Sequence, residues 1–215
     1  MPRTITVKGT GKVISPVDFV EISLTVLSTD ADYSRATCSN EEKLIALKSA
    51  LAGVGFDDNA LKTKSYNVCA EYKSEHSENG YSNKFVGYKC SHGLVLEFDF
   101  DNKTLSDVIC AVTNTIAEPN LYVRFTVKDK DSVCNTAIEN ACRNATEKAK
   151  ILCEASGVEL CEIVNITYSD IKPSLYSECD YSNDVMLMRS ATAGASINPQ
   201  DVEASDNVTI TWTIK

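Results

Sequence analysis

Hydrophobic and polar residues alternate along several stretches of this chain, which is the pattern of β-strands that bury one face. The alternation is clearest at residues 18–29, where Val20, Ile22 and Leu24 are separated by polar residues. Comparable stretches lie at residues 3–14, 60–74, 84–100, 121–127, 159–169 and 202–214. We therefore predict seven strands, spread along the whole chain.

Three other stretches repeat their hydrophobic residues every three or four positions, as amphipathic helices do. These predicted helices cover residues 32–54, 103–117 and 130–156. The longest of them has alanine at every fourth position, at Ala137, Ala141, Ala145 and Ala149. Small side chains let a neighbouring backbone approach closely, so we expect this helix to lie flat on a sheet.

Glycine and proline mark the expected turns and irregularities between these elements. Pro16 lies between the first two strands and predicts an antiparallel hairpin there, and Gly80, which follows an asparagine, predicts another hairpin tip. Gly93 predicts a bulge within a long strand. Gly9 and Gly11 lie on one face of the first strand, where glycine indicates a bulge or the close approach of another backbone.

The predicted elements follow the order ββαββαβαββ, with strands dispersed between helices. This order predicts an α+β fold, in which helices are layered on a mixed, largely antiparallel sheet. No linker rich in proline, glycine or serine divides the chain. We therefore expect a single domain over residues 1–215, with one long irregular segment at 171–200.

The segment 171–200 has no steady hydrophobic period, although it is rich in large apolar and aromatic side chains. A loop of this length in a compact domain is usually functional or mobile. Methionine and tyrosine are enriched at protein interfaces, so this segment is a candidate contact surface for another subunit. The candidate contact residues are Tyr176, Tyr181, Met186, Leu187 and Met188. The alternative is that the segment covers the core of its own domain or adds a short strand.

Composition and charge exclude several classes of function. The net charge of −9 opposes binding to nucleic acid or to an anionic membrane surface. With 43% hydrophobic and 24% charged residues, the chain has the composition of a folded globular protein. No stretch approaches the ~18 apolar residues of a membrane-spanning helix, and no apolar export segment is visible near the start. We therefore expect neither a nucleic-acid partner nor an integral membrane span.

The nine cysteines bear on the cellular compartment. Their number is odd, no two of them form a Cys-x-x-Cys pair, and most lie within apolar stretches. We therefore expect reduced, mostly buried cysteines that act as small hydrophobic residues, as in a reducing compartment. The sequence as written predicts a cytoplasmic protein. The alternative is a periplasmic or secreted protein from which an export signal has been removed.

Few residues of the chain suit catalysis. Of its two histidines, His76 and His92, only His92 has a neighbouring nucleophile, Cys90, two positions away on the same strand. Side chains so spaced share a face but usually lie beyond hydrogen-bond reach. Acidic pairs such as Asp99 and Asp101 stand where strands lead into helices, and there we expect aspartate to cap the helix rather than to bind a metal. The sequence therefore predicts no catalytic, cofactor-binding or metal-binding residues, and a protein that is not an enzyme.

Several small motifs, in a fixed order along residues 4–214, resemble the SIMPL-domain family. They are Val7, Gly9, Gly11 and Pro16, then Gly53 and Gly55, then Thr63, Ser65 and Tyr66, then Gly87 and Tyr88, the alanine helix that ends at Gly157, and Ile197, Asn198 and Pro199. The resemblance implies an α/β domain that tends to self-associate. Bacterial members of this family look mostly exported, as periplasmic or surface proteins linked to stress tolerance, and animal members look like kinase-associated signalling factors. The family has no established catalytic residues to carry over to this chain.

Two hypotheses from different classes follow. The first is a non-enzymatic, self-assembling protein that forms a homo-oligomer and acts as a scaffold or as an envelope or oxidative-stress factor. The second is a small-molecule-binding module, or a cryptic enzyme, with a pocket beneath the 171–200 segment. A stable large oligomer would favour the first hypothesis, and a monomer with a deep polar pocket would favour the second.

Overall fold

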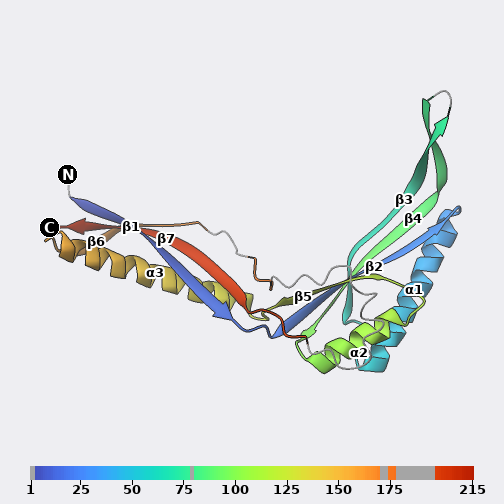
Figure 1. Cartoon of the computed structure of the whole chain (residues 1–215), viewed down its shortest axis with the longest axis horizontal. Coiled ribbons are helices and arrows are strands. Elements are labelled where there is room, and N and C mark those ends of the chain that lie inside the picture. Colours follow the sequence, from blue (N-terminus) through green and yellow to red (C-terminus); the bar gives the residue numbers. More distant parts are fainter. Residues whose placement is uncertain (1–2, 78–79, 170–173, 178–196) are drawn as a thin grey trace. The chain divides into compact units, whose positions relative to one another are not determined.

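The structure is a computed structural model that describes residues 3–77, 80–169, 174–177 and 197–215. Its elements follow the order ββαββαβαββ (Figure 1), as predicted from the hydrophobic periodicity. The elements are β1 (Thr4–Ser15), β2 (Phe19–Asp30), α1 (Tyr33–Val54), β3 (Leu61–Ser77), β4 (Gly80–Asp99), α2 (Asn102–Thr113), β5 (Asn120–Thr126), α3 (Lys130–Ala155), β6 (Leu160–Tyr168) and β7 (Val202–Ile214). The α+β class is therefore confirmed.

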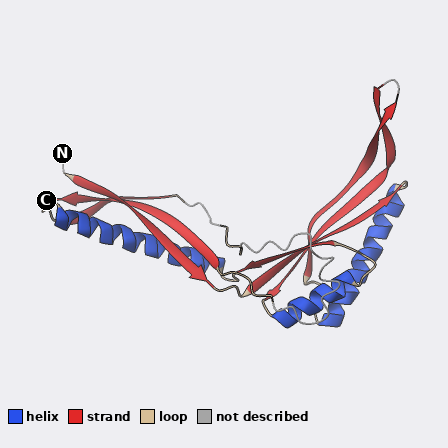
Figure 2. Ribbon diagram, in the orientation of Figure 1, coloured by secondary structure: helices blue, strands red, loops and turns tan. Residues whose placement is uncertain are grey.

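The strands form two sheets rather than the one sheet expected (Figure 2). A three-stranded sheet has the order β1-β7-β6, and a four-stranded sheet has the order β3-β4-β2-β5. Each sheet belongs to a separate compact unit: the first unit contains β1, α3, β6 and β7, and the second contains β2, α1, β3, β4, α2 and most of β5. The assignment of residues 1–215 to a single domain stays a prediction.

The hairpin expected between the first two strands is wrong. β1 pairs with β7 in antiparallel register from Thr4↔Thr213 to Ser15↔Val202, and β2 pairs with β4. The connection between β1 and β2 is bonded to the residues that follow β5, because the Asp18 side chain accepts a hydrogen bond from Lys128 N at 2.7 Å. Local turn signals marked this connection correctly as a turn, but the partner of each strand is set by packing far along the chain.

In the first unit, α3 lies directly on β1 and β7. Its four seam alanines are fully buried, and three of them pack with Val7, Val208, Ile210 and Trp212. The prediction of a close backbone approach at Gly9 and Gly11 is confirmed. A Cβ atom at Gly9 would lie 2.6 Å from Ala145 N, and one at Gly11 would lie 3.0 Å from the carbonyl carbon of Asn140. Glycine on the strand and alanine on the helix thus bring the two backbones together.

In the second unit, α1 packs on β2 and β4, and α2 packs on α1. The core here is made of large aliphatic side chains, among them Ile22, Leu24, Leu47, Leu94, Leu96, Leu105, Val108 and Val112. The irregularity predicted at Gly93 is present on the partner strand. The register of β3 shifts between Thr63 and Ser65, directly opposite Gly93.

The helices begin at aspartates, as the sequence predicted for the acidic pairs. Asp101 Oδ2 accepts a hydrogen bond from Thr104 N at 2.8 Å, and Asp129 Oδ1 accepts one from Ser132 N at 2.9 Å. The bond from the Thr104 backbone holds the pKa of Asp101 below its usual value. These carboxylates therefore stabilise helix N-termini.

The cysteines are more exposed than expected. Of the eight in the described ranges, Cys90 and Cys153 are buried, whereas Cys38, Cys69 and Cys110 are exposed, and all eight are free of disulfides. The periodicity failed here because an apolar neighbour does not place a helical cysteine on the buried face; Cys110 follows two buried residues but points outward. Their reduced state stays a prediction, and Cys179 lies outside the described residues.

Candidate functional site

The candidate contact residues of the segment 171–200 are described only in part. Tyr176 forms an isolated bridge with Thr126, whose hydroxyl donates a hydrogen bond to Leu175 O. Lys130 Nζ lies 4.9 Å from the centre of the Tyr176 ring. Tyr176 therefore packs within its own unit. The other candidates, Tyr181, Met186, Leu187 and Met188, lie outside the described residues, and their role at an interface stays a prediction.

A pocket of about 550 Å³ lies beside the described ends of this segment. Its lining residues are Ile14, Ser174, Tyr176, Gln200, Asp201 and Glu203. The lining is acidic, but Glu203 is paired with Lys12 Nζ at 2.6 Å. The sequence placed a pocket beneath the 171–200 segment, most of which lies outside the described residues, so both that pocket and the binding of a ligand stay predictions.

The three-stranded sheet has two outer strands, β1 and β6, and the outer backbone of β1 is covered by side chains of α3. Three pairs make this cover: Thr10 N donates to Asn144 Oδ1, Asn140 Nδ2 donates to Lys12 O, and Lys148 Nζ donates to Lys8 O, at 3.1–3.4 Å. An edge strand whose backbone groups are already bonded is a poor template for another strand. β1 is therefore a protected edge.

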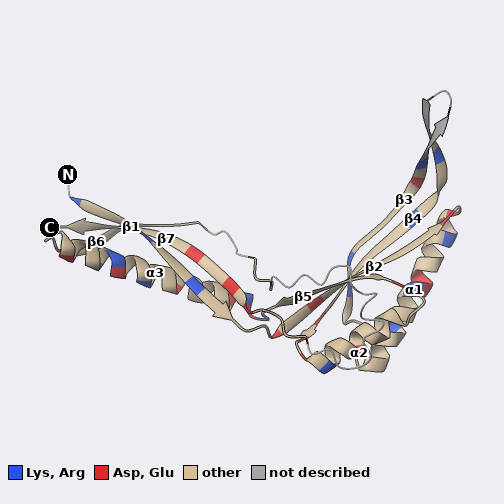
Figure 3. Cartoon of the chain, in the orientation of Figure 1, with Lys and Arg blue, Asp and Glu red and all other residues tan. Residues whose placement is uncertain are grey.

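The opposite edge strand, β6, has no such cover from α3, which barely touches it. Four of its large apolar side chains are exposed: Ile163 (54%), Val164 (57%), Ile166 (54%) and Tyr168 (39%). Ile163 and Ile166 stand opposite Trp212 and Ile210 of β7, so they lie on the sheet face that carries α3, beyond the part that the helix covers. Glu162 is the single charged residue of β6, whereas β1 and β7 each carry two (Figure 3). Among the described residues, no strand pairs with the outer side of β6.

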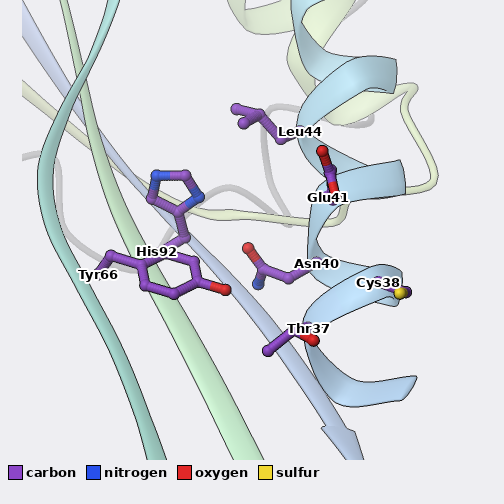
Figure 4. Close-up of a pocket in the computed structure, with 7 residues that line it drawn as sticks. All are labelled: Thr37, Cys38, Asn40, Glu41, Leu44, Tyr66 and His92. Atoms are coloured by element: carbon purple, nitrogen blue, oxygen red, sulfur yellow. The ribbon is translucent and has the colours of Figure 1, made fainter. Parts of the chain in front are cut away.

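A second candidate site is a pocket of about 260 Å³ in the second unit, between α1 and the strands β3 and β4 (Figure 4). Its lining residues are Thr37, Cys38, Asn40, Glu41 and Leu44 of α1, Tyr66 of β3 and His92 of β4. The strands reach it because Tyr66 and His92 are direct cross-strand partners. Their rings meet edge to face, with centres 5.0 Å apart.

His92 forms the base of this pocket. It is 6% exposed, and burial lowers its pKa below the ordinary 6.5, so that the ring is neutral at pH 7. His92 Nε2 lies 2.9 Å from Thr63 Oγ1. The nearby Cys90, which the sequence offered as its neighbour, is instead hydrogen-bonded to Tyr66, and this bond raises the pKa of Tyr66 to about 12. No carboxylate in the described part of the chain is recorded as bonded to the imidazole, so Thr63 and His92 lack the third group of a nucleophilic triad.

Asn40 is the polar side chain that the sequence did not single out. It is 1% exposed, and its Nδ2 donates to Val26 O at 3.3 Å, which fixes the orientation of the amide. Its Oδ1 is buried and has no hydrogen-bond partner among the described residues. A buried acceptor without a partner costs about 1–3 kcal/mol. Its position in the sequence could have singled it out, because Asn40 lies four residues before Leu44, on the apolar stripe of the helix that continues to Leu47.

None of the helices in the described ranges is long and apolar enough to cross a membrane. The same ranges contain no cluster of three or more His, Cys, Asp or Glu side chains that could hold a metal ion.

Two relatives are the 26 kDa periplasmic immunogenic proteins of Brucella melitensis biotype 1 and Brucella abortus strain S19. Each is 29% identical over 171 residues, which cover 77% of this chain and 66% of the relative. The expected cytoplasmic location is contradicted by these names, which place both relatives in the periplasm. The expectation failed because it rested on cysteine content, and the exposed positions of Cys38, Cys69 and Cys110 show that these cysteines are not simply core residues.

The family comparison covers nearly the whole chain. The model of the SIMPL family, described as a protein of unknown function (DUF541), matches residues 5–212 and so includes elements of both compact units. The match contains the glycine-rich first strand, the alanine helix and the last strand, which carried the resemblance in the sequence. On this match, the chain belongs to the SIMPL family.

Proposed function

We propose that this protein is a non-enzymatic scaffold that assembles with copies of itself through β6. The observation that carries the proposal is the difference between the two edges of one sheet. β1 has its outer backbone bonded by α3, whereas β6 presents an apolar edge that no strand in the described part of the chain covers. An edge of this kind is a template for adding a strand from another chain.

The partner that fits this edge best is β6 of a second copy. Such a contact is closed and symmetric, because each copy offers the same strand. If the two strands pair in antiparallel register about Val164, Glu162 of each copy faces Ile166 of the other, and the two carboxylates do not oppose each other. Pairing of β6 with β1 is disfavoured by the side chains of α3 that cover β1.

We also propose that the assembly works in the periplasm, which is where the names of the two Brucella relatives place those proteins. The match spans less than two thirds of the relatives' length, so their other properties are not transferred to this chain. A role in envelope or oxidative stress stays a prediction from the family resemblance. Fractionation of cells that express the whole gene product tests the location, and recovery in the cytoplasmic fraction alone would contradict it.

The experiment on assembly compares two isoleucines on opposite edges of one sheet. Ile166 of β6 is 54% exposed and Ile14 of β1 is 68% exposed, so lysine can replace either one without entering the core. In sedimentation velocity we expect an oligomer for the wild type, dissociation for Ile166→Lys and an unchanged oligomer for Ile14→Lys. A wild-type monomer, or the same behaviour in both variants, would show that the protein does not assemble through β6.

The same assay tests the candidate contacts of the segment 171–200. The double variant Met186→Asp/Met188→Asp would bury charge in any interface formed by this segment, and should dissociate it. If it dissociates the oligomer while Ile166→Lys does not, the segment and not β6 is the contact surface.

A further inference from the structure

The pocket in the second unit gathers hydrogen-bond acceptors from two different elements (Figure 4). Asn40 points from α1 toward His92 and Tyr66, and its buried Oδ1 has no partner among the described residues. The Nε2 atom of His92 is engaged by Thr63, and Figure 4 shows a ring nitrogen of His92 turned toward α1. A neutral imidazole whose Nε2–H donates to Thr63 leaves Nδ1 as an acceptor. In that tautomer both Asn40 Oδ1 and His92 Nδ1 are acceptors, so a ligand that satisfies them brings hydrogen-bond donors.

The charge of the pocket points to the same kind of ligand. Glu41 is its one acidic lining residue, and the lining contains no lysine or arginine. Nothing in this lining balances the negative charge of an anionic ligand, whereas a cation would be attracted by the carboxylate of Glu41. The net charge of −9 on the chain acts in the same direction.

The aromatic wall and the volume of the pocket narrow the class of ligand further. The Tyr66 ring lines the pocket beside His92, with its hydroxyl turned toward α1, and the face of an aromatic ring attracts a cation. The pKa of Tyr66 is raised to about 12 by its hydrogen bond to Cys90, so the phenol is neutral and does not act as a fixed anion. A volume of about 260 Å³ is below the range typical of pockets for drug-sized molecules.

We propose that this pocket binds a small organic ammonium ion, whose N–H groups donate to Asn40 Oδ1 and to His92 and whose charge is balanced by Glu41. The site is built entirely from α1, β3 and β4 of the second unit, whereas the proposed assembly uses β6 of the first. Ligand binding and assembly can therefore fail separately in experiments.

The test uses three probes of similar size with the whole chain at pH 7. They are n-propylammonium, which has a charge and N–H donors, tetramethylammonium, which has the charge without donors, and propionate, which has the opposite charge. Saturation-transfer NMR observes the probe and works whatever the size of the protein assembly. We expect saturable binding of propylammonium in the millimolar range, binding of tetramethylammonium weaker by about tenfold, since it cannot make the charge-assisted hydrogen bonds, and no binding of propionate.

Two neighbouring glutamates of α1 provide matched variants. Glu41 lines the pocket, whereas Glu42 is exposed and does not line it. We expect Glu41→Gln to weaken propylammonium binding by about tenfold, because it removes the charge from one charge-assisted contact, and Glu42→Gln to leave it unchanged. Asn40→Leu should abolish binding, because it removes the acceptor and keeps the branched shape of the side chain. If Asn40→Leu does not fold, the comparison of Glu41→Gln with Glu42→Gln decides alone.

Three results would overturn the proposal. The first is the absence of saturable propylammonium binding to the wild type. The second is tetramethylammonium or propionate binding as tightly as propylammonium, because Asn40 would then not be the acceptor. The third is equal binding by the Glu41→Gln and Glu42→Gln variants, because the probe would then bind outside this pocket.

Discussion

The two units of this chain place a helix on a sheet in opposite ways. In the first unit, alanines of α3 face Gly9 and Gly11 of β1, and the two backbones almost touch. In the second unit, large side chains such as Leu47 and Leu94 fill the space between α1 and its sheet. Close packing lets α3 bond to the outer backbone of β1 but leaves β6 uncovered. Packing through large side chains leaves room near the start of α1 for a polar pocket.

This comparison implies that the two units fail under opposite substitutions. The first unit is sensitive to added atoms, because no space separates helix and strand. The second is sensitive to removed atoms, because its core depends on filled volume. Each of the following predictions tests this difference between the two units.

The largest effect is expected at the glycines of β1. Gly11→Val places side-chain atoms where the backbone of α3 lies, and backbone cannot move aside as a flexible side chain does. We expect a loss of at least about 3 kcal/mol in the free energy of unfolding, or no folded first unit. Gly53→Ala is the control, since a Cβ there meets nothing within 4 Å, and its effect should be small. Urea denaturation of both variants measures the difference, and similar stabilities would contradict the close approach.

In the second unit the corresponding change is truncation. Leu47 of α1 is fully buried, so Leu47→Ala leaves a cavity and should cost about 3 kcal/mol. Leu44→Ala is its control on the same helix, because Leu44 is only half-buried and should lose less. The unfolding free energies of the two variants, measured in urea, test the assignment, and equal losses would place Leu47 outside the core.

A smaller effect is expected for Ala145→Leu on α3. Ala145 is fully buried against the first sheet, so the added atoms overpack the interface and should cost about 1–3 kcal/mol. Ala155→Leu makes the same change at an exposed position near the end of that helix and should be almost neutral. Thermal and urea unfolding compare the two variants, and equal stabilities would show that the alanine seam is not a tight contact.

The smallest effect concerns pH and the buried histidine of the second unit. Burial lowers the pKa of His92 below its unfolded value of about 6.5, so the folded state prefers the neutral ring. Its contribution to stability is therefore present above pH 6.5 and is lost as the pH falls below that value. The wild type should lose more stability than His92→Gln between pH 7.5 and pH 5. Denaturant titrations at both pH values measure this, and parallel losses would mean that His92 is not buried as a neutral ring.

Local periodicity predicted the order of elements, because the alternation of a strand and the repeat of a helix depend only on residues close together in the sequence. Gly9 and Gly11 also indicated the close approach of another backbone, since glycine has no side chain to prevent it. The partner of β1 was missed, because pairing with β7 depends on residues almost 200 positions away along the chain. The second sheet was missed for the same reason.

The candidate sites were less accessible to sequence reasoning. The exposed edge of β6 reads as an ordinary strand, since only the three-dimensional position of α3 shows that Ile163 and Ile166 are uncovered. Asn40 reads as a polar residue of a helix, and its unpaired Oδ1 becomes visible only when β2 and β4 are in place. By contrast, Asp101 was assigned correctly as a helix cap, because its acceptor role involves residues three positions away.

The most direct test of the central proposal is hydrogen exchange of the β6 amides at two protein concentrations. If β6 pairs with β6 of another copy, its outward amides become hydrogen-bonded in the oligomer, and their exchange should slow as concentration rises. The amides of β1, whose outer edge is already covered by α3, should exchange at the same rate at both concentrations. We expect the concentration dependence of β6 to disappear in Ile166→Lys. Exchange in β6 that does not depend on concentration, while the protein is oligomeric, would contradict assembly through this edge.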